Sequence, residues 1–253
     1  VLMENVPDMA LGNDLSIVRT MTARLEASGY DVDARLIDAW RLGVPQHRQR
    51  LILVGLRDGR TFVWPDAKRK KRVVLRDAIG DLPKLNDGTG ACEMTVGNPT
   101  TPFQRRARLG MNGTDVLWDH WTRHVRDDDR EAFSLLKPGM RYSELPKRLR
   151  RYRSDIFNDK YHRLAWDDLC RSITAHIAKD GYWYIHPSEQ RTLTVREAAR
   201  VQTFPDRFRF AGTRTHAFRQ IGNAVPPALG EAIGRELLRG ALRKRLPPSR
   251  RPG

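Results

Sequence analysis

A carboxylate and an amide stand together at the end of the first apolar run of the chain. Residues 1–7 read Val-Leu-Met-Glu-Asn-Val-Pro, which predicts a buried strand with Glu4 and Asn5 at its carboxyl end. Open α/β sheets bind ligands beyond the carboxyl ends of their strands. Glu4 is therefore a candidate acid for chemistry, with a loop- or helix-capping carboxylate as the alternative.

Two arginines with strand spacing form a second candidate. Arg48 and Arg50 directly precede the apolar run 51–56, and residues two apart on an extended segment point to the same face. A guanidinium supplies fixed, paired donors that suit a carbonyl oxygen or a phosphate. The alternative is two exposed arginines on an edge strand, in a chain that contains 46 Lys and Arg residues.

The elements around these residues alternate between strand and helix periodicity. A helix is expected between a cap at Asn13 or Asp14 and a stop at Gly29, followed by strands over 31–38 and 51–56. Its apolar positions share one helical face: Ile17, Val18, Met21 and Leu25. This order predicts a mostly parallel α/β sheet over residues 1–60.

Helical periodicity returns near the end of the chain. Thr194 and Glu197 have the spacing of a capping box, which predicts a helix through about Thr203. A last helix is expected from Pro226-Pro227, because proline is tolerated in a first helical turn. Residues 243–253 are rich in arginine and proline and are expected to form a disordered, basic tail.

The charge of the chain points to a polyanionic partner. Its 46 basic and 30 acidic residues give a net charge of +16 and a pI near 10.6. No amphipathic helix combines Lys and Arg with a bulky apolar face, so a nucleic acid is favoured over a membrane. The two cysteines give no disulfide framework and fit a reducing compartment, which predicts a cytoplasmic protein.

Two basic clusters fall in residues 61–165, where the helix and strand periodicity fades. One cluster is Lys-Arg-Lys-Lys-Arg at 68–72, and aromatic residues are interleaved with the second. The second cluster and its aromatics are Lys147, Arg148, Arg150, Arg151 and Arg153, with Tyr142, Tyr152 and Tyr161. This stretch is predicted to face DNA, although charge runs are often only solvated surfaces.

Four segments in this order resemble the DNA cytosine-5 methyltransferases. They are Glu-Asn-Val at 4–6, Gln-His-Arg-Gln-Arg at 46–50, the run from Arg191 to Asp206, and Gly-Asn-Ala-Val-Pro-Pro at 222–227. The first two patterns are weak alone, but the third is long and all four are in register. The resemblance covers about residues 1–60 and 165–240.

The resemblance implies the fold and its division. Residues 1–60 would form the C-terminal part of a Rossmann-like α/β methyltransferase sheet. Residues 61–165 would form a smaller, irregular and mainly β target-recognition region. Residues 166–242 would complete that region and return helices to the catalytic domain.

The resemblance also implies a reaction on double-stranded DNA. Family members flip a cytosine out of the duplex, add a cysteine thiolate to its C6, and transfer a methyl group from S-adenosylmethionine to C5. Glu4 would act at ring N3, Arg50 at O2, and Arg48 in the surrounding site and backbone, while Gln46 would brace the loop.

Further residues are assigned to the cofactor and the DNA. Asn223 and Ala224 would lie at the amino-acid end of S-adenosylmethionine, or Asn223 would simply form a turn before Pro226. Arg191, Arg196 and Arg200 would orient the recognition region. The residues expected at the DNA are Gln46, Arg48, Lys147, Arg148, Arg150, Arg191 and Arg196.

Two parts of the family's machinery are expected to lie N-terminal to Val1: a glycine-rich cofactor loop and a Pro-Cys nucleophile. Neither Cys92 nor Cys170 stands in the nucleophile's sequence context, so the isolated chain is expected to be inactive. His120 and His124 have helical spacing but no nearby third metal ligand. Three readings stay open: part of a single-chain enzyme, one subunit of a split enzyme whose partner carries the cysteine, or a non-catalytic DNA-binding remnant or regulator.

Overall fold

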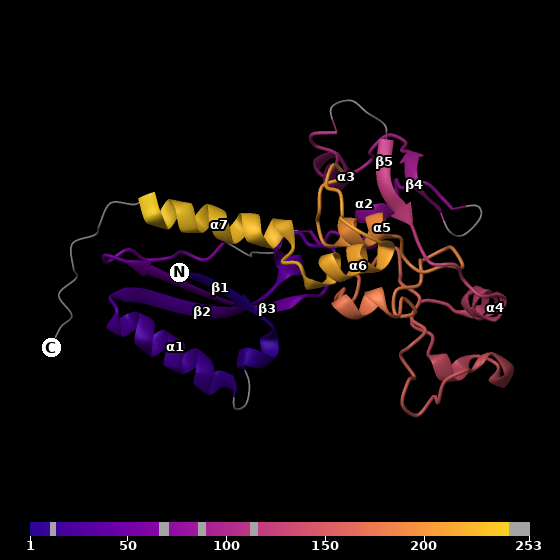
Figure 1. Cartoon of the computed structure of the whole chain (residues 1–253), viewed down its shortest axis with the longest axis horizontal. Coiled ribbons are helices and arrows are strands. Elements are labelled where there is room, and N and C mark those ends of the chain that lie inside the picture. Colours follow the sequence, from indigo (N-terminus) through magenta and orange to yellow (C-terminus); the bar gives the residue numbers. More distant parts are fainter. Residues whose placement is uncertain (11–13, 66–70, 86–89, 112–115, 243–253) are drawn as a thin grey trace. The chain divides into compact units, whose positions relative to one another are not determined.

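The computed structural model describes residues 1–10, 14–65, 71–85, 90–111 and 116–242. The chain divides into two compact units (Figure 1). Unit 1 comprises Val1–Gly43, Arg48–Lys71 and Pro227–Gly253, and unit 2 comprises Val44–His47 and Arg72–Pro226. The expected segment 166–242 is therefore divided, because only the part from Pro227 onward belongs to unit 1.

Unit 1 is built on a three-stranded sheet. Its strands are β1 (Leu2–Asn5), β2 (Tyr30–Asp38) and β3 (Gln49–Arg57), in the order β1-β3-β2 with both pairings antiparallel. The expectation of a mostly parallel sheet is wrong for these strands. β2 and β3 are joined without the long crossover that parallel neighbours need, so β3 returns antiparallel between β1 and β2.

The two faces of this sheet are covered by different helices. Leu51 and Leu53 of β3 pack with Val18 of α1 (Leu15–Ala27). On the other face, Gly240 of α7 (Pro227–Leu242) approaches Leu56 so closely that a Cβ there would lie 3.0 Å from the leucine Cδ1. Figure 1 shows α1 and α7 on opposite sides of the sheet. β3 is the buried strand of unit 1, as its apolar run predicts.

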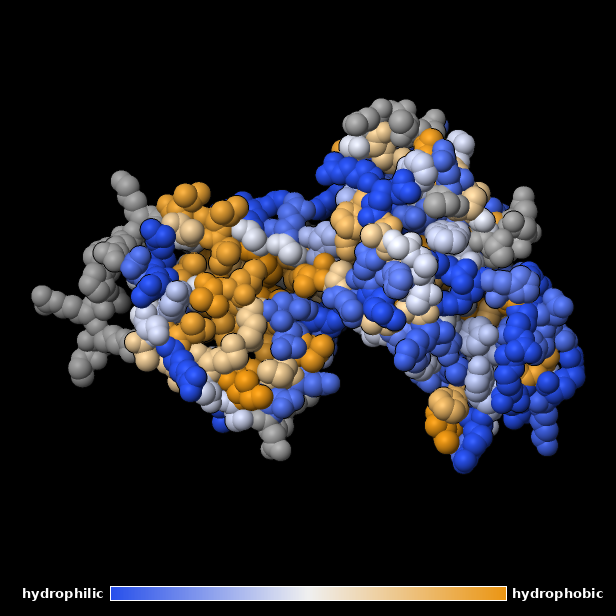
Figure 2. Space-filling model, viewed as in Figure 1, coloured by the Kyte–Doolittle hydropathy of each residue, from blue (hydrophilic) through white to orange (hydrophobic). Residues whose placement is uncertain are grey.

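The edges of unit 1 are more exposed than the sequence patterns suggest. No residue of β1 is fully buried, and Leu2 is 51% exposed, so the expected buried strand is only half-buried. α1 ends before Gly29, as expected, but Ile17 and Met21 of its predicted apolar face are exposed. The proposed cap Asn13 lies outside the described residues. Figure 2 shows apolar side chains gathered on the visible face of unit 1.

Unit 2 combines a small sheet with short helices. Its strands β4 (Gly90–Thr95) and β5 (Val116–Trp121) pair antiparallel. Its α-helices are α2 (Leu75–Ile79), α3 (Pro102–Ala107), α4 (Asp127–Leu135), α5 (Val195–Val201) and α6 (Arg214–Asn223). The described part of residues 61–165 thus contains three of these α-helices beside two strands, so "mainly β" does not describe it.

Single helical turns connect these elements. They are η1 (Pro7–Ala10), η3 (Ala39–Leu42), η4 (Tyr142–Glu144), η5 (Lys147–Leu149) and η6 (Ala175–Ala178). The largest core cluster of unit 2 surrounds α5, where Ala198, Ala199 and Val201 are fully buried. The helix that the family-like run 191–206 predicts is therefore the central element of unit 2.

The capping box at the start of α5 is present as predicted. The Thr194 hydroxyl accepts a hydrogen bond from the Glu197 N–H at 3.0 Å, and Glu197 Oε2 accepts one from the Thr194 N–H at 2.7 Å. We expect Thr194→Ala to lower the free energy of unfolding by about 1–2 kcal/mol, measured by urea denaturation. Thr213→Ala is the matched control, because its exposed hydroxyl caps α6 at 3.5 Å and should contribute less. Equal losses in the two variants would contradict this ranking.

Candidate functional site

The structure brings Glu4 and Arg50 together in unit 1. In the β1–β3 register Glu4 lies opposite Ile52, so Arg50 is its diagonal neighbour on the same face of the sheet. Glu4 Oε1 lies 2.7 Å from Arg50 Nε, and both side chains are partly exposed. Arg50 Nη1 also donates to the backbone carbonyl of Gln49 at 2.7 Å. An acid and a guanidinium are thus held side by side, with access to solvent.

Arg48 lies two residues before Arg50, with an exposed residue between them, as the expected alternation requires. Its side chain is only 1% exposed. Its backbone N–H donates to Asp38 Oδ1 at 2.9 Å, and its carbonyl accepts from the Ala39 N–H at 3.0 Å. These bonds fix the start of β3 against the end of β2, and thereby the position from which Arg50 extends.

Gln46 is a buried brace within unit 2. Its amide nitrogen donates to the Val201 carbonyl at 3.1 Å and to Gln202 Oε1 at 3.0 Å. Its amide oxygen accepts from the Ile173 N–H at 2.9 Å. Because this side chain is fully buried and its amide bonds to these three residues, it has no surface for DNA in this conformation.

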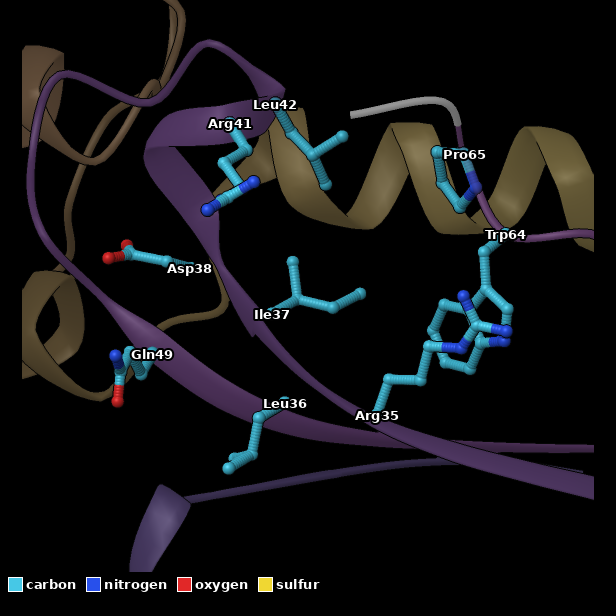
Figure 3. A pocket seen from close by; sticks show the side chains of 9 residues that line it. All are labelled: Arg35, Leu36, Ile37, Asp38, Arg41, Leu42, Gln49, Trp64 and Pro65. Carbon is cyan, nitrogen blue, oxygen red and sulfur yellow. The ribbon is translucent and has the colours of Figure 1, made fainter. Parts of the chain in front are cut away.

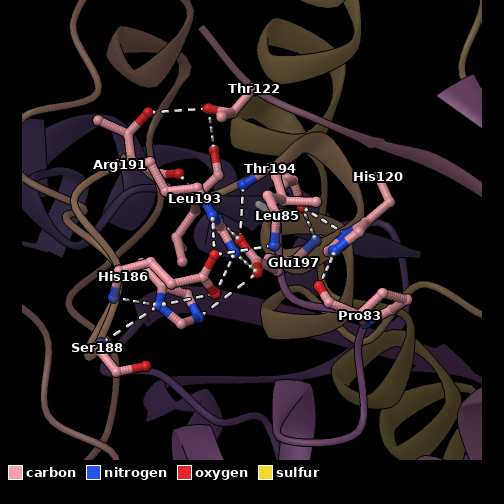
Figure 4. Close-up of polar contacts among 12 residues, drawn as sticks. Pro83, Leu85, His120, Thr122, His186, Ser188, Arg191, Leu193, Thr194 and Glu197 are labelled. Carbon is pink, nitrogen blue, oxygen red and sulfur yellow. Dashed lines mark hydrogen bonds and ion pairs between the residues drawn. The ribbon is translucent and has the colours of Figure 1, made fainter. Parts of the chain in front are cut away.

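Arg191 and Glu197 form the centre of a buried polar network (Figure 4). Two Arg191 nitrogens donate to the two Glu197 carboxylate oxygens at 2.8 and 2.7 Å, and each side chain is 1% exposed. Burial alone would raise the pKa of Glu197, but the charge and hydrogen bonds of Arg191 outweigh it and lower that pKa. Burial lowers the pKa of the neighbouring His186 to about 4, so this imidazole is neutral at pH 7. Arg191 therefore stabilises the start of α5 and is not available to DNA.

Arg196 and Arg200 also point into the protein. Arg196 Nε donates to the Trp118 carbonyl at 2.9 Å, and its Nη2 donates to the Phe208 carbonyl at 2.7 Å. Arg200 Nε donates to Asp206 at 2.6 Å. Both guanidinium groups are fully buried. They tie α5 to β5 and to the segment after α5, so Arg196, expected at the DNA, has a packing role here.

The second basic cluster is largely paired within unit 2. Arg148 donates to Glu131 at 2.7 Å, and Arg151 pairs with Asp128 in the acidic first turn of α4. Arg150 donates to the carbonyl of Leu145 at 2.8 Å. Lys147 is exposed and forms no ion pair with a described residue. The cluster therefore presents less free charge than its sequence suggests, and most of the cluster at 68–72 lies outside the described residues.

The tyrosines interleaved with that cluster form a core. Tyr142 and Tyr161 are buried, with ring centroids 4.9 Å apart. The Tyr182 hydroxyl donates to Asp129 at 2.7 Å, and Tyr161 donates to the other carboxylate oxygen. Tyr152 packs against the same cluster. The rings of Tyr142 and Tyr161 are therefore not free to stack on bases, whereas Tyr152 is only partly buried.

Asn223 is the last residue of α6 and is exposed. It lines an open hollow of about 440 Å³ in unit 2 together with His216, Arg219 and Gln220. Ala224 follows at the C-cap, where its N–H donates to the Ile221 carbonyl at 3.3 Å. Asn223 is thus placed to hydrogen-bond a ligand, and the alternative of a turn-forming residue is compatible with the same geometry.

A second hollow, of about 350 Å³, lies in unit 1 and was not anticipated from the sequence (Figure 3). Ile37 and Leu42 point toward one another across it, and Arg41 and Trp64 lie at its rim. The Trp64 indole is held by a 2.5 Å hydrogen bond to Asp33. No single sequence pattern marks this hollow, because its lining combines residues of the run 35–42 with Gln49, Trp64 and Pro65.

Among the described residues, the remaining candidates form no second reactive site. Cys170 is fully buried, and burial raises the pKa of its thiol to about 12, which disfavours the thiolate. The side chain of Cys92 lies outside the described residues. His120 is buried, with Nε2 2.7 Å from the Pro83 carbonyl and Nδ1 3.1 Å from the Thr194 hydroxyl. Its nitrogens are thus engaged in packing α5 against β5.

Comparisons with known proteins identify the family. Residues 1–239 match the family model of the C-5 cytosine-specific DNA methylases, and the chain belongs to this family. A type II methyltransferase of Bacillus paralicheniformis is 32% identical over 92% of this chain and 58% of its own length. One from Xanthomonas oryzae is 32% identical over 96% of this chain and 59% of its own length. The chain thus spans less than two thirds of the length of these relatives.

Solved structures agree on the fold. A candidate DNA modification methyltransferase encoded within an E. coli prophage superposes with a TM-score of 0.74 at 24% identity, covering 96% of this chain and 69% of that one. A methyltransferase of Entamoeba histolytica gives 0.53 at 12% identity, over 96% of this chain and 63% of that one. The Rossmann-like α/β prediction is confirmed. Among the described residues, no helix has the length and apolarity to cross a membrane.

Proposed function

We propose that this chain supplies the base-holding and DNA-reading parts of a DNA cytosine-5 methyltransferase. The observation that carries the proposal is the Glu4–Arg50 pair, which joins an acid and a guanidinium 2.7 Å apart at the carboxyl end of β1. A cytosine flipped out of the duplex offers adjacent polar atoms on one edge, ring N3 and the O2 carbonyl. Glu4 serves N3 and Arg50 serves O2.

The two side chains act on the same ring in complementary ways. Glu4, when protonated, donates to N3 and withdraws electrons from the ring, which favours addition of a nucleophile at C6. Arg50 uses Nε and Nη1 for Glu4 and the Gln49 carbonyl, and its Nη2 protons are left for O2. Glu4 therefore exchanges part of its contact with Arg50 for a contact to N3, while Arg50 reaches O2 through Nη2.

The cofactor of this reaction is S-adenosylmethionine, which supplies an electrophilic methyl group when bound. The hollow beside Asn223 is lined by neutral and cationic hydrogen-bonding side chains, His216, Arg219 and Gln220, which suit a carboxylate. Asn223 and Ala224 would hold the amino-acid end of the cofactor. The hydrogen-bond donors that line the hollow support this placement of the cofactor's amino-acid end.

Unit 2 contacts the DNA in this proposal. The buried arginines of the run 191–206 hold its elements in place, while exposed Lys147 contacts the backbone of double-stranded DNA. Arg148 joins it by exchanging its exposed pair with Glu131 for a phosphate. Arg150 is partly buried and bound to a carbonyl, so its role is to shape the loop that carries them.

The nucleophilic cysteine and most of the cofactor pocket come from polypeptide outside these 253 residues, either in the same chain or as a separate subunit. Cys170 cannot serve because it is buried in the core of unit 2. The exposed apolar side chains of β1 and α1, Leu2, Ile17 and Met21, provide a surface on which such a part can pack. The second candidate function, a DNA-binding regulator without catalysis, shares the unit 2 surface but does not require the Glu4–Arg50 pair.

Expression in a bacterial host followed by bisulfite sequencing tests the proposal. The chain expressed together with the polypeptide encoded directly upstream is expected to methylate cytosine at one recurrent sequence in the host DNA. The 253-residue chain expressed alone is expected to give no methylation above background. Methylation by the chain alone would contradict the external nucleophile, and its absence in the combined experiment would favour the regulator.

A further inference from the structure

Two arginines of unit 2, Arg123 and Arg214, lie close together without a carboxylate partner. Among the described residues, neither forms an ion pair. Arg191 and Arg200 of unit 2, by contrast, bind Glu or Asp directly, whereas the buried Arg163 donates to backbone carbonyls. Two neighbouring, partly buried guanidinium groups that form no ion pair with a described residue are an unusual arrangement, because buried charges are ordinarily paired.

Arg123 follows β5 and reaches across to η6. Its Nη2 donates to the carbonyls of Ile177 and Ala178, the latter at 2.7 Å, and its guanidinium carbon lies 4.9 Å from the Phe218 ring centroid. A Cβ at residue 181 would lie 2.7 Å from Nη1, so Gly181 makes room for this side chain. Nη1 itself is buried and has no hydrogen-bond acceptor.

Arg214 is the first residue of α6. Its Nη1 donates to the carbonyl of Thr122, the residue beside Arg123, at 2.8 Å, and its guanidinium carbon lies 5.9 Å from the Trp121 ring centroid. Arg214 Nε and Trp121 Nε1 are also buried without an acceptor. Three N–H groups on Trp121, Arg123 and Arg214 therefore lack an acceptor, and Arg214 lies at the end of α6 where the backbone dipole is positive.

The electrostatics favour an anion at this place. Burial and the repulsion of Arg214 lower the pKa of Arg123 to about 10, and burial lowers the pKa of Arg214. The acid that acts on Arg123 is Asp180, whose carboxylate is already paired with Lys160 at 2.9 Å. Capping of η6 explains the Arg123 carbonyl contacts, but it does not explain a second cation placed beside them.

We propose that Arg123 and Arg214 together bind a phosphate group. Guanidinium groups match phosphate oxygens with paired donors, and the partly exposed Arg214 gives the anion access from solvent. The inference rests on the proposed function, since a DNA methyltransferase meets phosphodiesters along the backbone of its substrate. Such a contact fixes the position of the duplex without reading its sequence.

DNA binding by the full chain tests the proposal. The affinity for a short labelled duplex is measured by fluorescence anisotropy over a range of KCl concentrations. Arg214→Ala is expected to weaken binding roughly three- to tenfold and to reduce the slope of log K against log[KCl] by about 0.9, the value for one phosphate contact. Arg214→Lys, which keeps the charge, should retain the slope. Circular dichroism confirms that each variant is folded.

Arg235→Ala is the matched control, because Arg235 is an exposed arginine of α7 paired with Glu231 at 2.6 Å. It should leave the slope unchanged. A slope that is the same for wild type, Arg214→Ala and Arg235→Ala would overturn the DNA contact. If the wild-type chain itself does not bind DNA, the proposed function fails, which is a distinguishable result.

Inorganic phosphate separates the two sources of a phosphate group. Thermal unfolding is compared in phosphate and in chloride at equal ionic strength. Phosphate should raise the Tm of wild type more than that of Arg214→Ala. If phosphate raises the Tm of wild type more, while wild type and Arg214→Ala bind DNA equally well, the site takes free phosphate and the DNA assignment is overturned. If wild type and Arg214→Ala behave identically in the DNA-binding and thermal-unfolding assays, the phosphate site is overturned altogether.

Discussion

Replacing Glu4 by Gln is expected to lower the rate of methyl transfer by roughly a hundredfold to ten-thousandfold in the assembled enzyme. The amide can still donate a hydrogen bond to N3, but it cannot transfer a proton to the ring. It also removes the negative partner of Arg50, which lies 2.7 Å away. Single-turnover transfer of a labelled methyl group to a duplex with the mapped recognition sequence measures this loss. DNA affinity should change little, because the substitution leaves unit 2 untouched.

Glu26→Gln is the matched control for this experiment. Glu26 is an exposed carboxylate of α1 in the same unit, so the same chemical change is made away from the Glu4–Arg50 pair. Its rate should equal that of wild type. A Glu4→Gln enzyme that transfers methyl groups at the wild-type rate would remove Glu4 from the chemistry and leave it as a structural partner of Arg50.

Replacing Glu197 by Ala is expected to cost about 3–5 kcal/mol of folding free energy, since it leaves the buried Arg191 guanidinium without its main counter-ion. Glu197 accepts hydrogen bonds from two Arg191 nitrogens and from the Thr194 N–H, and all three groups are buried. Its pKa is lowered in the folded state, so the carboxylate contributes stability above its unfolded pKa and loses that contribution in acid. Urea denaturation at neutral pH measures the loss.

Glu231→Ala provides the comparison for Glu197→Ala. Glu231 lies on α7 and forms an exposed ion pair with Arg235, a kind of contact that contributes about 0–1 kcal/mol. The loss of unfolding free energy in Glu231→Ala should therefore be small. If Glu197→Ala unfolds at the same urea concentration as Glu231→Ala, the network around α5 does not have the role assigned to it here.

The sequence predicted the elements whose signals are local. β3 is a continuous apolar run, the α5 cap is a four-residue pattern, and Gly29 lies just after α1 with a φ of 82°, as a helix stop requires. The antiparallel order β1-β3-β2 was not predicted, because strand direction depends on the connection between β2 and β3 and not on periodicity. The exposure of Ile17 and Met21 was missed because a periodic apolar face does not show whether anything covers it.

For the candidate site, the family-like motifs located Glu4 and Arg50, and the structure places them in contact. The arginines of the run 191–206 were harder to interpret. Sequence alone gives Arg196 a charge and a position, but its burial follows from long-range bonds to the carbonyls of Trp118 and Phe208. The Arg123–Arg214 arrangement has no local signal at all, since its members are far apart in the chain.

A substrate with one atom changed tests the central claim most directly. In 3-deazacytosine a carbon replaces N3, so the proposed partner of Glu4 is missing. Methyl transfer is measured for wild type and Glu4→Gln on duplexes with cytosine or 3-deazacytosine at the target position. We predict that wild type loses rate on the analogue and that Glu4→Gln loses little more, because both changes remove the same interaction. If the factor by which the analogue lowers the rate is the same for wild type and Glu4→Gln, then Glu4 and N3 act independently, which would contradict the proposed role.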